Sequence, residues 1–205
     1  MGSVREGRTR RELLAAGVGA GTAAAALLVP EPALAAGAPA PESDTSWLHR
    51  LLSVELLLLF AYKYVLDSSM LRPRAQRALT PLRAHEQAHI RALRHQLSAR
   101  GGIAPPPPPS IAEADRDLAH RDVVGRLGQL RGAHDALVLL LAVERVTVGV
   151  YFVALTKLRD PRLIVLAAEI MANDAQHEAV LGEQLDPGNV AMAVPYGLVQ
   201  GRQGR

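Results

Sequence analysis

One polar pattern occurs twice within the apolar helix-forming segments of this chain, and it constrains the fold more than any other feature. Each copy holds a Glu with a Tyr seven residues later, followed by an acidic residue with a His three residues later. On a helix, residues three or four apart share a face, and residues seven apart share it two turns on. Each copy therefore places its polar side chains on one face of each of two helices. The first copy contains Glu55, Tyr62, Glu86 and His89, and the second contains Glu144, Tyr151, Asp174 and His177.

A single acid-x-x-His step is weak evidence of a site. With 20 acidic residues and 7 histidines among 205 positions, roughly 0.7 such steps are expected by chance. A third step, formed by Asp117 and His120, lies in a polar segment, and we take it as this chance match. The signal is the repetition of the whole unit at a spacing of about 88 residues.

Four segments show the apolar periodicity of long helices: about 45–66, 73–100, 133–158 and 161–184. We expect Asp44 or Thr45 to cap the first helix. The second begins at Pro73 or at Pro81, because proline suits the first turn of a helix, and Thr80 is a good cap before Pro81.

The linker after the second helix predicts the topology. Gly101 and Gly102 end that helix, and the run Pro105–Pro109 then favours an extended polyproline II conformation. At about 3.1 Å per residue, the segment 103–110 spans roughly 25 Å, which is close to the length of a helix of 16–18 residues. The chain then returns along the bundle, and the helices on either side of the linker run parallel. A short helix over 110–120 follows, with a capping box at its start.

Each predicted helix carries its acidic residue in the middle of an apolar stripe. An ionised carboxylate in a core is very costly unless it is paired or bound to metal. Four carboxylates and two neutral imidazoles carry a charge of −4, which two divalent cations balance. Oxygen-rich ligation with one His per ion suits iron or manganese better than zinc or copper.

This arrangement resembles the ferritin-like di-iron carboxylate superfamily, in which two helices each give a Glu and two each give a Glu-x-x-His step. The chain is similar to exported ferritin-like domain proteins of actinobacteria. The resemblance implies an all-α, ferritin-like four-helix bundle with a long proline-rich crossover between helices two and three. It also implies that Glu55 and Glu144 are terminal ligands and that Glu86 and Asp174 are bridging carboxylates. His89 and His177 would each bind one metal, and Tyr62 and Tyr151 would lie next to the ligands.

The sequence departs from the family pattern at Asp174, where Glu is usual. Aspartate is one methylene shorter, so whether Asp174 completes a second metal site stays open. Glu169 and Glu178 flank this position and are alternatives to it. The remaining histidines lie off the inward stripes, and we expect them to be solvated: His49, His85, His95 and His134.

The two ends of the chain have their own composition. Residues 1–35 resemble a twin-arginine export signal, with Arg10 and Arg11 before a Gly/Ala-rich apolar run and a small-x-small cleavage site at its end. We expect a flexible lead over 36–43, the bundle over 44–185, and an irregular tail over 186–205. The predicted location is therefore extracytoplasmic, either in the cell envelope or secreted.

Composition excludes several classes. The chain has no Cys, which rules out disulfides, iron–sulfur clusters and thiol catalysis. The net charge is only +3 and the arginines are scattered, so no nucleic-acid partner is expected. The first helix is apolar most of the way round, and a homodimer through this helix is one explanation.

Two functions follow. The first is a di-iron (alternatively manganese) protein of oxidoreductase type that acts on O₂ or peroxide, with iron oxidation as the simplest reaction. The alternative is a metal-free structural or binding bundle of the cell envelope, which Asp174 and the apolar first helix favour. The sequence does not choose between iron and manganese, and it names neither the substrate nor the oligomeric state.

Overall fold

The computed structural model describes residues 42–194. The predicted export signal over 1–35, the lead as far as residue 41 and the last part of the tail, 195–205, lie outside the described residues.

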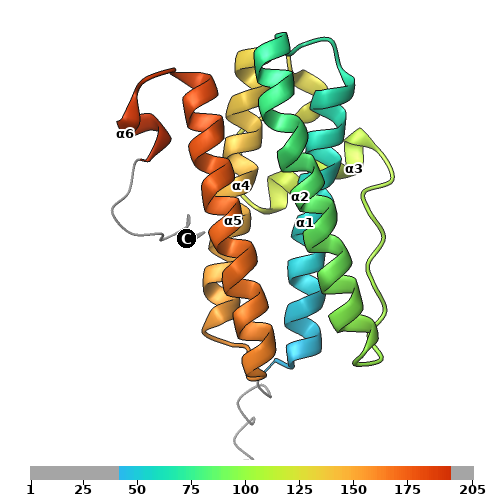
Figure 1. The fold of residues 1–205 in the computed structure, drawn as a ribbon. Coiled ribbons are helices and arrows are strands. Elements are labelled where there is room, and N and C mark those ends of the chain that lie inside the picture. Colours follow the sequence, from blue (N-terminus) through green and yellow to red (C-terminus); the bar gives the residue numbers. More distant parts are fainter. Residues whose placement is uncertain (1–41, 195–205) are drawn as a thin grey trace, which may run out of the picture. The chain divides into compact units, whose positions relative to one another are not determined.

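The described part of the chain is all-α and contains no strand, which confirms the predicted class. Four long helices form the bundle (Figure 1). They are α1 (Asp44–Asp67), α2 (Pro73–Ser98), α4 (Ala133–Leu155) and α5 (Pro161–Leu185). Three shorter elements complete the chain: α3 (Ile111–His120), the 3₁₀ turn η1 (Leu127–Gln129) and α6 (Val190–Ala193).

Contacts at one end of the bundle fix the helix directions. The Asp44 carboxylate, in the first turn of α1, accepts hydrogen bonds of 2.9 Å from the backbone N–H groups of Arg159 and Asp160, just before α5. Arg100, just after α2, forms an ion pair with Asp160. The start of α1, the end of α2 and the α4–α5 turn therefore meet. It follows that α2 and α4 run in the same direction, and Figure 1 shows the linker returning along the bundle as predicted.

The start of α2 settles the choice between two prolines. The helix begins at Pro73, and Pro81 lies inside it. Thr80 is therefore not a cap, and its hydroxyl instead donates to the carbonyl of Gln76. An internal proline costs one backbone hydrogen bond, but the turn before it buries Leu79 completely in the core, which keeps this segment helical.

Other helix ends show smaller differences from the prediction. The cap of α1 is Ser43, whose hydroxyl accepts from the N–H of Ser46, because the Asp44 carboxylate is used by the α4–α5 turn. As predicted, the glycine pair ends α2. Gly101 has a φ of +71°, and the Gly102 N–H donates to the carbonyl of Leu97.

Most apolar residues of α1 are buried against other helices of the same chain. Helix α1 packs against α2 and α4, and its Leu57 and Ala61 lie in one apolar cluster with Ala114 and Leu118 of α3. Thirteen of its residues are buried. This packing gives the composition of α1 an explanation that needs no second subunit.

Helix α4 is long and apolar enough to cross a membrane, with a mean hydropathy of 2.0 over an 18-residue window. Most of that window is buried in the bundle, where α4 lies against α1 and α5 and carries the buried Glu144. Its position as a core helix therefore accounts for its composition.

The predicted tail is not irregular throughout, because α6 forms within it and packs on α5. The contact is made at Gly182, where an added Cβ would lie 2.6 Å from the carbonyl oxygen of Met192. This close approach of two backbones requires glycine at that position.

Candidate metal centre

The six residues singled out from the sequence meet in the middle of the bundle. Helix α1 provides Glu55, α2 provides Glu86 and His89, α4 provides Glu144, and α5 provides Asp174 and His177. All four carboxylates are completely buried, and the two histidines are nearly so, with 8% of His89 and 2% of His177 exposed.

The cluster divides into two overlapping groups of four residues. In each group the candidate ligand atoms lie within 4.8 Å of one another. Glu86 and Asp174 belong to both groups, and each group adds one Glu and one His of its own. Each group could hold a metal ion.

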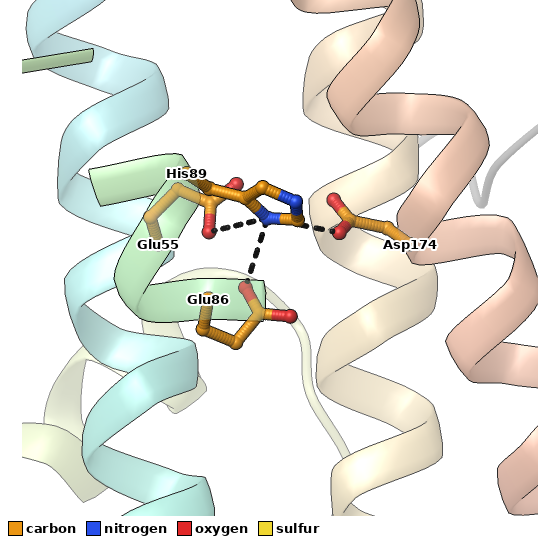
Figure 2. Close-up of side chains that lie close together, drawn as sticks. All are labelled: Glu55, Glu86, His89 and Asp174. Atoms are coloured by element: carbon orange, nitrogen blue, oxygen red, sulfur yellow. Dashed lines mark ion pairs between the residues drawn. The ribbon is translucent and has the colours of Figure 1, made fainter. Parts of the chain in front are cut away.

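The first group contains Glu55 and His89 with the two shared carboxylates (Figure 2). The Nδ1 atom of His89 lies 3.4 Å from Glu86, 3.4 Å from Asp174 and 3.7 Å from Glu55. Figure 2 shows the ring of His89 between the three carboxylates, which come from three different helices.

The second group contains Glu144 and His177 with the same shared carboxylates. The Nδ1 atom of His177 lies 2.9 Å from Glu86, 3.2 Å from Glu144 and 3.8 Å from Asp174. Both histidines therefore turn the same nitrogen toward the carboxylates.

The two shared carboxylates reach the histidines differently. Glu86 presents Oε2 to His89 and Oε1 to His177. The shorter Asp174 presents Oδ1 to both histidines, at 3.4 and 3.8 Å. Asp174 thus reaches both groups in spite of the missing methylene.

Each tyrosine donates a hydrogen bond to a carboxylate from the other copy of the pattern. Tyr62 donates to Glu144 at 2.5 Å, and Tyr151 donates to Glu55 at 2.6 Å. Each hydroxyl thus holds the carboxylate of the other copy. Burial and the neighbouring carboxylates raise the pKa of both tyrosines, so both hydroxyls keep their protons and act as donors.

The cluster brings acidic and basic groups together in the buried core. Burial, together with the charges of Glu55 and Glu144, raises the pKa of Glu86 and of Asp174 well above the ordinary carboxyl range. Burial also disfavours the charged ring of His89, but the carboxylates of Glu55 and Glu86 outweigh it and raise the pKa of His89 to about 11. The cluster therefore retains protons that a bound cation would displace.

Most polar atoms of the cluster form no hydrogen bond of ordinary geometry, although several of them lie 2.9–3.8 Å from an imidazole or carboxylate atom. In residues 42–194, eight buried side-chain atoms have none, and all but the indole nitrogen of Trp47 belong to the cluster. Buried polar atoms are normally satisfied, so this concentration is unusual. Carboxylate oxygens and imidazole nitrogens are suitable ligands for iron or manganese, and the residues fit two such ions. The unpartnered atoms are Glu55 Oε2, Glu86 Oε1 and Oε2, His89 Nδ1, Glu144 Oε2, and Asp174 Oδ1 and Oδ2.

The weaker candidates from the sequence stay outside the cluster. Glu169 is exposed, and Glu178 faces Arg145 at 3.4 Å, so neither replaces Asp174. Burial raises the pKa of Glu178 to about 6 against the lowering effect of Arg145. The other candidates are exposed and do not belong to either group: Asp117, His120, His49, His95 and His134.

One contact was missed. His85 is exposed, as expected, but its Nδ1 also lies 3.0 Å from Nε2 of His177. The two rings stack with centroids 5.3 Å apart and planes inclined by 16°. His85 directly precedes Glu86 and lies beside the inward stripe of α2, so helical periodicity gave no signal for it.

The comparison with known proteins agrees with this geometry. The family model for the ferritin-like domain matches residues 43–186, which include all four long helices. No curated protein and no solved structure matches the chain.

Proposed function

The chain belongs to the family of ferritin-like domains, and on that premise we propose that its buried cluster holds two iron or manganese ions for oxidation–reduction chemistry. The observation that carries the proposal is the set of unpartnered carboxylate and imidazole atoms in the middle of the bundle. Two divalent ions would balance the four carboxylates and give each of these atoms a partner.

The residues divide between two ion positions. Glu55 and His89 would hold one ion, Glu144 and His177 the other, and Glu86 and Asp174 would bridge them. When bound in the reduced state, such ions supply electrons to O₂ or peroxide, and oxidation of iron is the simplest reaction of this kind.

Two tyrosines and the surrounding core hold the carboxylates in place for the ions. The hydroxyls of Tyr62 and Tyr151 each occupy one oxygen of a terminal carboxylate and leave the other oxygen free. The complete burial of all four carboxylates keeps bulk water away from the ions.

The place of action belongs to the same proposal. The twin-arginine-like segment in residues 1–35 supports export, and an exported protein of this kind would act in the cell envelope or outside the cell. Cleavage of this segment on export would leave a chain that begins near residue 36.

The test is the metal content of the purified full chain after expression with added iron and manganese. We expect about two ions in the parent chain, none in Glu86→Ala, and about two in Glu169→Ala, a control that removes an exposed Glu from α5. Glu86→Ala should lose both ions because Glu86 belongs to both groups.

The same experiment addresses the metal-free alternative. A folded parent chain without metal would contradict the proposal and leave a structural or binding module. In that case Glu86→Ala should be neutral or stabilising, because it removes an unpartnered buried carboxylate.

A further inference from the structure

The hydrogen bond between His85 and His177 connects the cluster to the surface of the bundle. His177 turns Nδ1 toward Glu86 and Glu144, and its opposite nitrogen, Nε2, lies 3.0 Å from His85. The ring of His177 is therefore held at both nitrogens. His85 is exposed, so it has no role in filling the core.

An imidazole suits this position because it can reverse the direction of the bond. When Nδ1 of His177 binds a cation, its remaining proton is on Nε2, and His85 accepts it through Nδ1. Without a cation, His177 donates from Nδ1 to Glu144 at 3.2 Å, and His85 can donate to Nε2 in its other tautomer. The hydrogen bond therefore orients His177 both before and after an ion enters.

The other half of the cluster has no such support. The residue that corresponds to His85 in the second copy of the pattern is Asn173, directly before Asp174. Among the hydrogen bonds of the described residues, none joins Asn173 or any other side chain to the outer nitrogen of His89. The polar contacts of the His89 ring are those of Nδ1 on its inner side, at 3.4–3.7 Å, and the ring also stacks on that of His177 with centroids 6.2 Å apart.

We propose that His85 is a positioning residue for His177 and makes the ion position of Glu144 and His177 the tighter of the two. The inference rests on the proposed function, because it requires that the cluster binds metal. Loss of a partner of this kind typically weakens metal binding about 10- to 100-fold.

The experiment is an anaerobic titration of the metal-free full chain with Mn²⁺ and, separately, with Fe²⁺, followed by calorimetry. Two variants separate hydrogen bonding from stacking. His85→Asn keeps a polar atom where Nδ1 was, and His85→Phe keeps the ring but no hydrogen bond. The control is His95→Asn, which changes an exposed histidine of the same helix. Helix content and thermal unfolding check that each variant is folded.

We expect the parent chain and His95→Asn to bind two ions in two steps. His85→Phe should weaken the tighter step about 10- to 100-fold and leave the total at two, whereas His85→Asn should change it less than about threefold. Glu144→Gln should abolish the tighter step, and Glu55→Gln the weaker one.

Two results would overturn the inference alone: both steps unchanged in His85→Phe, or the tighter step lost in Glu55→Gln instead of Glu144→Gln. A parent chain that binds neither ion would overturn the proposed function, and the inference with it.

Discussion

The two halves of the cluster come from the same sequence pattern, but their surroundings differ. In the half with His177, Nδ1 lies 2.9 Å and 3.2 Å from two carboxylates, and His85 holds the outer nitrogen. In the half with His89, the shortest such distance is 3.4 Å, and the ring is more exposed, at 8% against 2%. A repeated set of ligand types therefore does not imply two equal sites, because the residues behind the ligands also contribute.

The next residues along each helix show the same contrast. Arg145 follows Glu144 and Glu178 follows His177, and these two side chains face each other at 3.4 Å across α4 and α5. The corresponding residues of the first half are Leu56 and Ile90, which are apolar and buried. A partly buried ion pair thus lies beside one half of the cluster, and only apolar packing lies beside the other.

The largest expected effect comes from removing one histidine at a time. His89→Ala should keep one ion at the tighter position, and His177→Ala should keep one ion bound at least about tenfold more weakly. At a free Mn²⁺ concentration 100 times the tighter Kd, loading should stabilise His89→Ala by about 2.7 kcal/mol and His177→Ala by at most about 1.4 kcal/mol. Denaturant unfolding with and without Mn²⁺ measures both values, and equal stabilisation would show that the halves are equivalent.

The stability of the metal-free chain should also depend on pH. The raised pKa values of Glu86 and Asp174 stabilise the fold below the unfolded values of 4.5 and 3.8, and this contribution is lost as pH rises through the folded values. His89, with a pKa of about 11, stabilises the fold below 6.5, and this contribution is lost between pH 6.5 and 11. The free energy of unfolding should therefore fall as pH rises from 5 to 9, by at most about 1.4 kcal/mol per pH unit for each group.

A histidine variant tests the assignment of this pH dependence. His89→Ala should flatten the fall above pH 6.5, because it removes the group whose pKa is raised to about 11. With Mn²⁺ present the trend should reverse, because the ligands bind metal in their deprotonated forms. Denaturant unfolding at pH 5, 7 and 9 provides the comparison, and a metal-free chain that gains stability toward pH 9 would contradict the assignment.

The smallest difference between the two halves is expected at the tyrosines. Tyr62→Phe and Tyr151→Phe each remove one donor to a buried carboxylate and should each cost about 1–3 kcal/mol in the metal-free chain. The two losses should be similar and nearly additive, because the acceptors are different residues. Tyr64→Phe, at a partly buried site on α1, should change stability by less than about 0.5 kcal/mol. Unequal losses from Tyr62→Phe and Tyr151→Phe would show that the two halves also differ at the tyrosines.

The sequence predicted the class of the fold and the residues of the cluster because both depend on local periodicity. Apolar stripes and the repeated pattern brought Glu55, Glu86, Glu144 and Asp174 to inward faces, and the length of the proline run predicted the crossover. The start of α2 was uncertain, because Pro73 and Pro81 are equally suitable first residues and only the burial of Leu79 decides between them.

Contacts between helices were harder to predict. The seven-residue spacing places each Tyr on the face of its own Glu, but roughly 10 Å further along the helix. Since α1 and α4 are antiparallel, seven residues forward on one helix lie level with seven residues back on the other. Tyr62 therefore meets Glu144, and Tyr151 meets Glu55. The contact between His85 and His177 likewise depends on how closely α2 and α5 approach each other. The periodicity of α2 alone does not predict that distance.

The proline linker makes one chain behave as a tethered pair of subunits. The α1–α2 unit and the α4–α5 unit each contribute two carboxylates, one imidazole and one phenol whose acceptor lies on the other unit. Neither unit satisfies its own buried groups, and the linker makes the meeting of the two units an intramolecular event. Two identical subunits would repeat every contact by symmetry. A single chain is free of that constraint, so position 85 can be His while position 173 is Asn.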